Sequence, residues 1–218
     1  MKIIISCAGN KSEQATKLRD FSGREIIFVA DPCKVKNGNE GIIYFRPDDR
    51  NPSSNKSWRE FLVEYNNQGD NYLNLTKAAN LYKPNIYKAL VNKFGWDNVF
   101  ILSAGWGLVR ANYLLPYYNI TFSYSKYPET IRKEKQIFHD FDHLKDDDVE
   151  DHEIHYFGGD KYLNLLYQLT NQIHADKFIH YSKQNIDALS GYKYIKYSRS
   201  FTNWYYECAK EFIEKRQS

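Results

Sequence analysis

The sequence predicts an α/β protein with three layers, in which helices cover both faces of a mainly parallel sheet. One observation is a set of short apolar runs, rich in β-branched residues, such as residues 3–6 and 98–103. Their length and composition are typical of buried parallel strands. A second observation is that segments with helical spacing of apolar residues, such as 162–173, alternate with these runs. This alternation is the pattern of a doubly covered sheet.

The elements follow one another along the whole chain. Strands are predicted at residues 3–6, 25–30, 41–45, 98–103, 153–157, 177–181 and 192–197, and helices at 58–65, 75–94, 129–144, 162–173 and 202–215. Pro84 is a candidate break in the second helix, and Gly95 is its expected C-cap. Thr202 or Asn203 is expected to cap the last helix.

Composition limits the class of protein. The chain has 218 residues, of which 42% are hydrophobic, and no linker rich in Pro, Ser or Gly divides it, so residues 1–218 are predicted to form a single domain. The net charge of +3 is too small to establish nucleic-acid binding. The three cysteines lie far apart and form no CxxC pattern, which fits reduced thiols. The first apolar run is too short for a secretion signal and no run reaches transmembrane length, so we expect a cytoplasmic protein without membrane association.

Three loops follow predicted strands and carry small residues with a nearby cation. In α/β proteins such loops lie at the carboxyl end of the sheet, where ligands usually bind. Free N–H groups in glycine-rich loops and at helix starts favour phosphate. The candidate phosphate- or nucleotide-binding residues are Asn10 and Lys11 in the first loop, Ser103, Gly105, Trp106, Gly107 and Arg110 in the second, and Gly158, Gly159 and Lys161 in the third.

Each loop taken alone could equally be an ordinary strand-to-helix turn. The first is not a phosphate-binding P-loop, because the GxxxxGK[ST] spacing is absent. Three such loops, with Lys11, Arg110 and Lys161 beside them, could converge on one crevice. We therefore expect a nucleotide or nucleic-acid phosphate to bind there.

Two clusters could supply chemistry or base recognition. Asp48 and Asp49 could act as an acid and a base, although adjacent carboxylates with flanking arginines are also typical of a surface turn. In the segment 199–207, Arg199, Asn203 and Trp204 could read or stack on a base, and Glu207 could act as a general base. Helix capping and core packing are the alternative for that segment. Tyr117 and Tyr118 are further candidates for base stacking.

The histidines indicate no metal site. His139 and His143 have the i, i+4 spacing of a metal-binding pair, but a third ligand is unassigned and no glutamate stands in the HExxH position. We therefore expect neither a metal nor a cofactor.

The ordered set of these features resembles the YaaA-like family, the peroxide-stress protein and its relatives. The shared features are a strand ending in Ser-Cys followed by Lys11, a Leu-Tyr pair at 81–82, the segment 101–108, a Leu-Pro-Tyr turn at 115–117, and a strand leading into Gly159-x-x-Tyr162. The segment 199–207 departs from the family pattern, which has glycine-rich turns and a Leu-Trp pair there. The resemblance implies an α/β core and an association with DNA or nucleotides.

Two functions follow as hypotheses. One is an enzyme that acts on a nucleotide or nucleobase, by glycosidic-bond cleavage or transfer, in DNA modification, stress or defence. The alternative is a noncatalytic DNA-binding stress-response protein that contacts phosphates without reading sequence. The sequence leaves the oligomeric state open.

Overall fold

A mostly parallel sheet of seven strands organises the chain. The computed structural model describes residues 1–35, 39–122, 139–145, 147, 153–183 and 188–216. The strand order is β10-β7-β6-β1-β11-β12-β13, and every neighbouring pair is parallel except β6 and β7. The strands are β1 Lys2–Ser6, β6 Val99–Ser103, β7 Gly107–Arg110, β10 Phe141–Asp142, β11 Glu153–Phe157, β12 Asp176–Tyr181 and β13 Lys193–Lys196. The α/β class and the mainly parallel sheet are confirmed.

The central strand β1 is completely buried because neighbours cover it on both sides. It pairs in parallel with β6, Ser6 lying opposite Leu102, and with β11, Ile5 lying opposite Phe157. The loops after β1, β6, β11 and β12 therefore leave the sheet at the same end. We call this the carboxyl end of the sheet, and it positions the candidate site.

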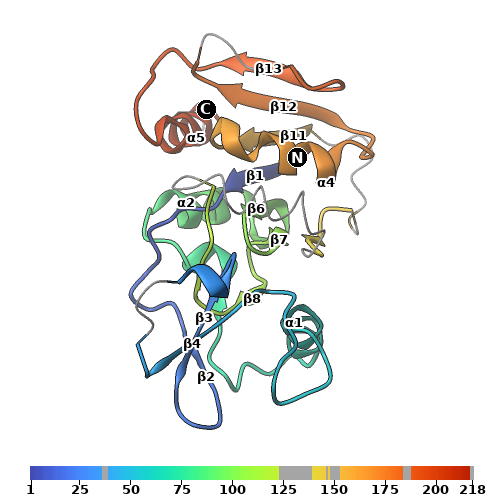
Figure 1. The fold of residues 1–218 in the computed structure, drawn as a ribbon. Coiled ribbons are helices and arrows are strands. Elements are labelled where there is room, and N and C mark those ends of the chain that lie inside the picture. Colours follow the sequence, from blue (N-terminus) through green and yellow to red (C-terminus); the bar gives the residue numbers. More distant parts are fainter. Residues whose placement is uncertain (36–38, 123–138, 146, 148–152, 184–187, 217–218) are drawn as a thin grey trace.

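Two predicted strands lie outside this sheet. The runs at 25–30 and 41–45 become β3 (Glu25–Val29) and β4 (Ile42–Phe45), which pair with each other in parallel. With β2 (Leu18–Arg19) and β9 (Tyr118–Asn119) they form a second sheet, below the main one in Figure 1. A short apolar run carries no information about which distant run will pair with it, so the sequence did not reveal the second sheet.

The helices match the predicted positions in part. α1 (Trp58–Asn67) begins at a capping box formed by Ser57 and Glu60, and α2 (Ile86–Phe94) ends at Gly95, whose φ is +84°. The other helices are α4 (Leu163–Thr170), which follows the 3-10 turn η4 (Asp160–Tyr162), and α5 (Trp204–Lys215). α5 begins two residues later than predicted, with Asn203 in the left-handed conformation and without a side-chain capping bond.

Two predicted helices needed correction. Residues 75–85 are not helical: they form β5 (Thr76–Lys77), which pairs with β8 (Leu114–Leu115), and the 3-10 turn η2 (Ala78–Asn80). The other 3-10 turns are η1 (Pro32–Lys34) and η3 (Trp96–Asn98). Most of the helix predicted at 129–144 lies outside the described residues, and its last part contains strand β10 instead. α2 and α5 pack on each other through the ring pairs Tyr87–Tyr206 and Phe94–Phe212.

Candidate functional site at the carboxyl end of the sheet

The glycine loop after β6 is part of the core. Ser103, Gly105, Trp106 and Gly107 are all buried. The backbone N–H groups of Gly105 and Trp106 donate to Ser103 Oγ at 3.2 and 3.1 Å, so the hydroxyl of the same loop already occupies them. These N–H groups therefore do not face a ligand, contrary to the sequence-based expectation.

Close packing explains the two glycines of this loop. A Cβ at Gly107, whose φ is +89°, would lie 2.5 Å from the Phe141 carbonyl oxygen. A Cβ at Gly105 would lie 2.9 Å from Ile120 Cδ1. Glycine is required here because β10 and the segment around Ile120 press against the loop.

Arg59 on α1 holds the same loop from the other side. Its guanidinium donates to the carbonyl oxygens of Gly105 at 2.7 Å and Trp106 at 3.0 Å, and to Asp48 Oδ1 at 2.9 Å. Arg59 is only 4% exposed. The sequence did not indicate this residue, because an arginine within an amphipathic helix is usually on the solvent side.

The two candidate acids Asp48 and Asp49 have structural partners. Asp48 is bonded to Arg59 and to His139, and Asp49 accepts bonds from the backbone N–H and the Nε of Arg46. These contacts agree with the surface turn that the sequence offered as the alternative for Asp48 and Asp49. The structure places both carboxylates beside α1, and Asp48 is linked through Arg59 to the loop after β6.

Arg110 does not join the other candidate cations. It lies opposite Phe100 in the β6–β7 pair, three residues along β7 from Gly107, which is about 10 Å in a strand. It forms an ion pair with Asp147, which also pairs with Lys2 at the amino end of β1. The predicted convergence of Lys11, Arg110 and Lys161 on one crevice is therefore wrong for Arg110, because β7 runs antiparallel to β6.

A cluster of tyrosine hydroxyls surrounds the loop after β1. Cys7 Sγ lies 3.2 Å from the Tyr162 hydroxyl, and the Tyr87 hydroxyl donates to the Ser6 carbonyl oxygen at 2.8 Å. The hydroxyls of Tyr82 and Tyr118 are 2.6 Å apart, and Ser103 Oγ donates to Tyr118 at 2.8 Å. We call the tyrosine cluster the set Tyr82, Tyr87, Tyr118, Tyr156, Tyr162, Tyr205 and Tyr206. The high tyrosine content was the available signal, but the grouping depends on contacts among α2, β9, β11, η4, α5 and the segment that contains Tyr82.

Lys11 lies against two members of this cluster, Tyr82 and Tyr118. The backbone ties its loop to the next segment, since Ser12 N–H donates to the Leu81 carbonyl oxygen at 2.8 Å. The Lys11 ammonium donates to the Ala8 carbonyl oxygen at 2.7 Å and lies 4.2 Å from the Tyr118 ring centre and 5.0 Å from that of Tyr82. Among the described residues, no carboxylate forms an ion pair with it.

Burial sets the protonation of the cluster. It lowers the pKa of Lys11 to about 8, although a Cys7 thiolate nearby would act in the opposite direction. Burial also raises the pKa values of Tyr82, Tyr118 and Tyr162 well above their usual range. At neutral pH the phenols are therefore uncharged hydrogen-bonding groups, and Lys11 releases its proton more easily than an exposed lysine.

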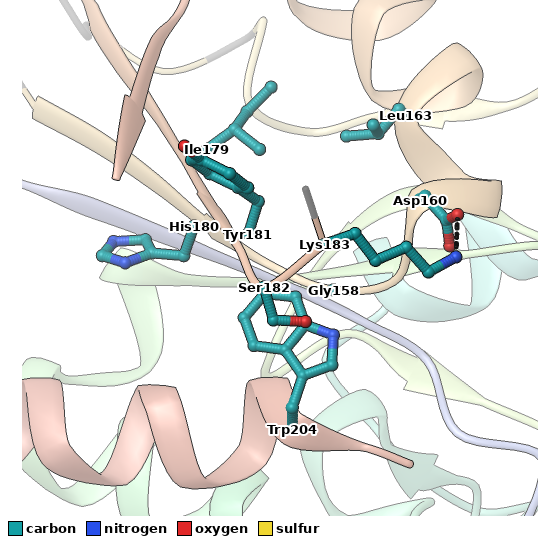
Figure 2. A pocket seen from close by; sticks show the side chains of 9 residues that line it. All are labelled: Gly158, Asp160, Leu163, Ile179, His180, Tyr181, Ser182, Lys183 and Trp204. Carbon is teal, nitrogen blue, oxygen red and sulfur yellow. Dashed lines mark hydrogen bonds and ion pairs between the residues drawn. The ribbon is translucent and has the colours of Figure 1, made fainter. Parts of the chain in front are cut away.

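An apolar pocket opens beside the cluster, between the ends of β11 and β12 and the start of α5 (Figure 2). It has a cavity volume of about 30 Å³ and is lined by Gly158, Asp160, Leu163, Ile179, His180, Tyr181, Ser182, Lys183 and Trp204. We call it the Trp204 pocket. Ser182 Oγ is buried and has no hydrogen-bond partner among the described residues. Figure 2 shows Lys183 bonded to Asp160 across the pocket, at 2.7 Å.

The loop after β11 connects the pocket to the cluster. A Cβ at Gly158 would lie 2.7 Å from Ser6 Oγ and would also clash with the Tyr156 hydroxyl. The Tyr156 hydroxyl donates to the Gly159 carbonyl oxygen at 3.1 Å. Gly158 is thus a wall of the pocket and a direct neighbour of the residues around Cys7.

The remaining candidate residues differ in their burial and in their contacts around this site. Lys161 and Asn10 are exposed beside it, Tyr118 is buried under Lys11, and Tyr117 is half-buried with Lys17 near its ring. Trp204 lines the pocket and stacks on Tyr197 with ring centres 5.9 Å apart. The three other candidate residues of the segment 199–207 are exposed, namely Arg199, Asn203 and Glu207. Arg199 forms an ion pair with Glu211.

A buried histidine pair lies on the α5 side of the sheet. His155 Nδ1 is 3.1 Å from His180 Nε2, and Cys208 Sγ is 3.7 Å from His180 Nδ1. Burial lowers the pKa of His180 to about 3 and also lowers that of His155. In Figure 2 the His180 ring points away from Lys183 and Asp160. Within the described part of the chain, no three His, Cys, Asp or Glu side chains are arranged to hold a metal ion.

No protein-family model, no curated protein and no solved structure matches this chain. Of the helices in the described residues, none combines the length and the apolar character needed to cross a membrane.

Proposed function

We propose that the protein is an enzyme acting on a nucleotide or nucleobase, by cleavage or transfer at a glycosidic bond, at the carboxyl end of its central sheet. The observation that carries the proposal is the position of Gly158. It forms a wall of the Trp204 pocket and lies against Ser6, and the next residue, Cys7, interacts electrostatically with Lys11. A ring held in the pocket would thus place the atoms attached to it near titratable groups.

The half-buried Trp204 gives the open side of the pocket an aromatic face on which a planar heterocycle could stack. Trp204, Leu163 and Ile179 give it apolar walls, and aromatic stacking on a base is worth about 1–3 kcal/mol. The unpartnered Ser182 hydroxyl could pair with a base edge, which would remove the cost of leaving it unsatisfied. Lys161 is exposed and directly follows Asp160, which lines the pocket, so it is our candidate for contacting a phosphate attached to the ligand.

The resemblance to the YaaA-like family remains a prediction, and its implied association with DNA or nucleotides agrees with this proposal. It also keeps open the alternative of noncatalytic DNA binding. The two functions differ in which groups they use. An enzyme of this kind needs the Trp204 pocket, whereas a protein that contacts DNA phosphates needs exposed cations and shows steep salt dependence.

Thermal unfolding with ligands tests the proposal. Nucleoside monophosphates, nucleosides and free bases are added at millimolar concentration, and at least one should raise the Tm by several degrees, because a ligand of the native state adds stability. Trp204→Leu should abolish that shift. Trp96→Leu, which changes the same residue type in η3 at the other end of β6, should retain it.

The outcome that contradicts the proposal is the absence of a shift with any of these compounds. A duplex oligonucleotide that binds equally well to the Trp204→Leu variant, with affinity falling steeply between about 50 and 200 mM salt, would support the noncatalytic alternative instead.

A further inference from the structure

We propose that a groove along the β10 edge of the main sheet binds a single-stranded nucleic acid. The groove lies between α1, the segment after β7 and strand β10, and it is lined by Lys77 and by residues within the ranges 63–71, 110–114 and 140–145. We call it the β10 groove. It is separate from the Trp204 pocket, because β10 and β12 are five strand spacings, or about 24 Å, apart in the sheet. The inference therefore goes beyond the proposed function and does not depend on it.

The β10 groove is large and is held in shape by hydrogen bonds. Its volume is about 960 Å³, against about 30 Å³ for the Trp204 pocket, and sites that hold whole ligands typically have about 300–1,000 Å³. The Asn66 amide joins α1 to β8, since it donates to the Leu114 carbonyl oxygen at 3.1 Å and accepts the Leu114 N–H at 2.8 Å. The Tyr113 N–H donates to the Arg110 carbonyl oxygen at 3.1 Å and closes the turn after β7. The walls of the groove are therefore fixed before a ligand binds.

A column of stacked rings leads from the core into the groove. Trp106 stacks on Phe141 with ring centres 6.1 Å apart, and Phe141 stacks on His143 with ring centres 5.3 Å apart. Trp106 is completely buried, whereas Phe141 and His143 are half-buried and line the groove. The Tyr113 ring also lines it, with its centre 4.5 Å from that of His143. Aromatic side chains bind single strands because every base has a π-face, so a base at this end of the column would extend the stack.

Three cations line the groove. Lys77 and Lys145 are exposed, and no carboxylate of the described ranges forms an ion pair with either ammonium group. Arg110 shares the Asp147 carboxylate with Lys2, so one negative charge there faces two positive ones. Lys77 lies opposite Leu114 in the β5–β8 pair, at the other end of the segment that begins with Arg110. These cations are therefore placed to contact successive phosphates of one strand.

The carboxylates of the groove are less accessible than its cations. The Asp140 side chain is only 4% exposed and lies 3.9 Å from the Arg59 guanidinium. Asp142 is half-buried, and its Oδ1 accepts a backbone N–H at 3.4 Å. The exposed charge of the groove is therefore mainly positive, which favours an anionic ligand.

Two amides add hydrogen-bonding capacity. The side chains of Asn67 and Asn112 line the groove and form no hydrogen bond within the part of the chain that the structure describes. An amide both donates and accepts, as the edge of a base does. A single strand presents base faces, base edges and phosphates together, whereas a duplex keeps its base faces stacked inside. The combination of rings, amides and cations thus favours a single strand.

Fluorescence anisotropy with labelled oligothymidylate and oligouridylate of about twelve nucleotides tests the inference. The double variant Lys77→Gln/Lys145→Gln should bind at least about tenfold more weakly near 0.1 M salt. The slope of log affinity against log salt should fall by about 1.4, since each phosphate contact of a single strand contributes about 0.7. The control Lys88→Gln/Lys210→Gln removes two exposed charges from α2 and α5 and should retain the affinity and the slope. A DNA duplex of the same length should bind at least about tenfold more weakly than the single strand.

Equal losses in the two lysine double variants, or a duplex that binds as tightly as the single strand, would overturn the inference. Inorganic polyphosphate that competes as well as the oligonucleotide, charge for charge, would also overturn it, because the rings would then contribute nothing. If Trp204→Leu loses oligonucleotide binding and the Lys77/Lys145 variant keeps it, the strand lies at the Trp204 pocket and only the proposed function stands. If the reverse holds and no nucleotide raises the Tm, the groove stands and the proposed function fails.

Discussion

The two glycine loops of this protein begin alike and end in opposite environments. Ser103–Gly107 follows β6, and Gly158–Gly159 follows β11, both directly after buried strands. The first loop is enclosed by Arg59, Ser103 and β10, so its polar groups are used inside the protein. The second borders a pocket, and a Cβ added at Gly159 would meet no atom within 4 Å. A glycine after a strand therefore indicates that another group lies close to its backbone. That group can belong to the protein itself rather than to a ligand.

The largest expected effect concerns the arginine that holds the first loop. Arg59→Met should lower the free energy of unfolding by about 3–5 kcal/mol, because two buried carbonyl oxygens lose their donor and the half-buried Asp48 carboxylate keeps only His139 as a partner. Urea unfolding measures the change. Arg199→Met, at an exposed ion pair, is the matched control and should leave the midpoint nearly unchanged. Equal effects of both substitutions would refute the structural role of Arg59.

The next effect compares the two loops directly. Gly107→Ala should destabilise the protein by about 2–4 kcal/mol, since the position has a positive φ and the new Cβ would meet the Phe141 backbone. Gly159→Ala should change stability by less than about 0.5 kcal/mol, because its φ is −76° and the space is open. The same unfolding titration measures both, and similar losses would remove the distinction between the loops.

A pH-dependent effect belongs to the β11–β12 side, where the histidine pair lies. The pKa of His180 is lower in the folded than in the unfolded state, so below about pH 6.5 the unfolded chain binds more protons. Above that pH the lowered pKa values of the pair therefore do not reduce the free energy of unfolding. As the pH decreases from about 6.5 toward 3, the free energy of unfolding falls by up to about 1.4 kcal/mol per pH unit for each proton that the unfolded chain binds. Arg216 and Lys215 contribute to the lowered pKa, and Glu153 opposes it at His155.

Unfolding of the unaltered chain and of the double variant His155→Phe/His180→Phe, measured from pH 7 to 4, isolates this contribution from that of the carboxylates. The double variant should show the shallower pH dependence. Identical slopes would mean that the pair does not exclude protons in the folded state.

Local sequence signals determined much of the framework. The apolar runs at β1, β6, β11 and β12 were recognisable because a strand buried on both faces needs a continuous set of apolar side chains. The start of α1 at Trp58 and the end of α2 at Gly95 also depend on short-range bonds that the sequence records. Lys11, Gly158 and Trp204 could be selected as site candidates because each stands just after a strand or at a helix start.

Only the tertiary structure decided which of these candidates meet. The antiparallel turn from β6 into β7 carries Arg110 away from the carboxyl end, and pairing between distant strands places β3 and β4 in a second sheet. The tyrosine cluster and the Arg59 contacts join segments tens of residues apart, and the lowered pKa of Lys11 comes from burial among them. Burial and charge environment are properties of contacts between distant segments, so a single sequence specifies the groups but leaves their chemistry to the fold.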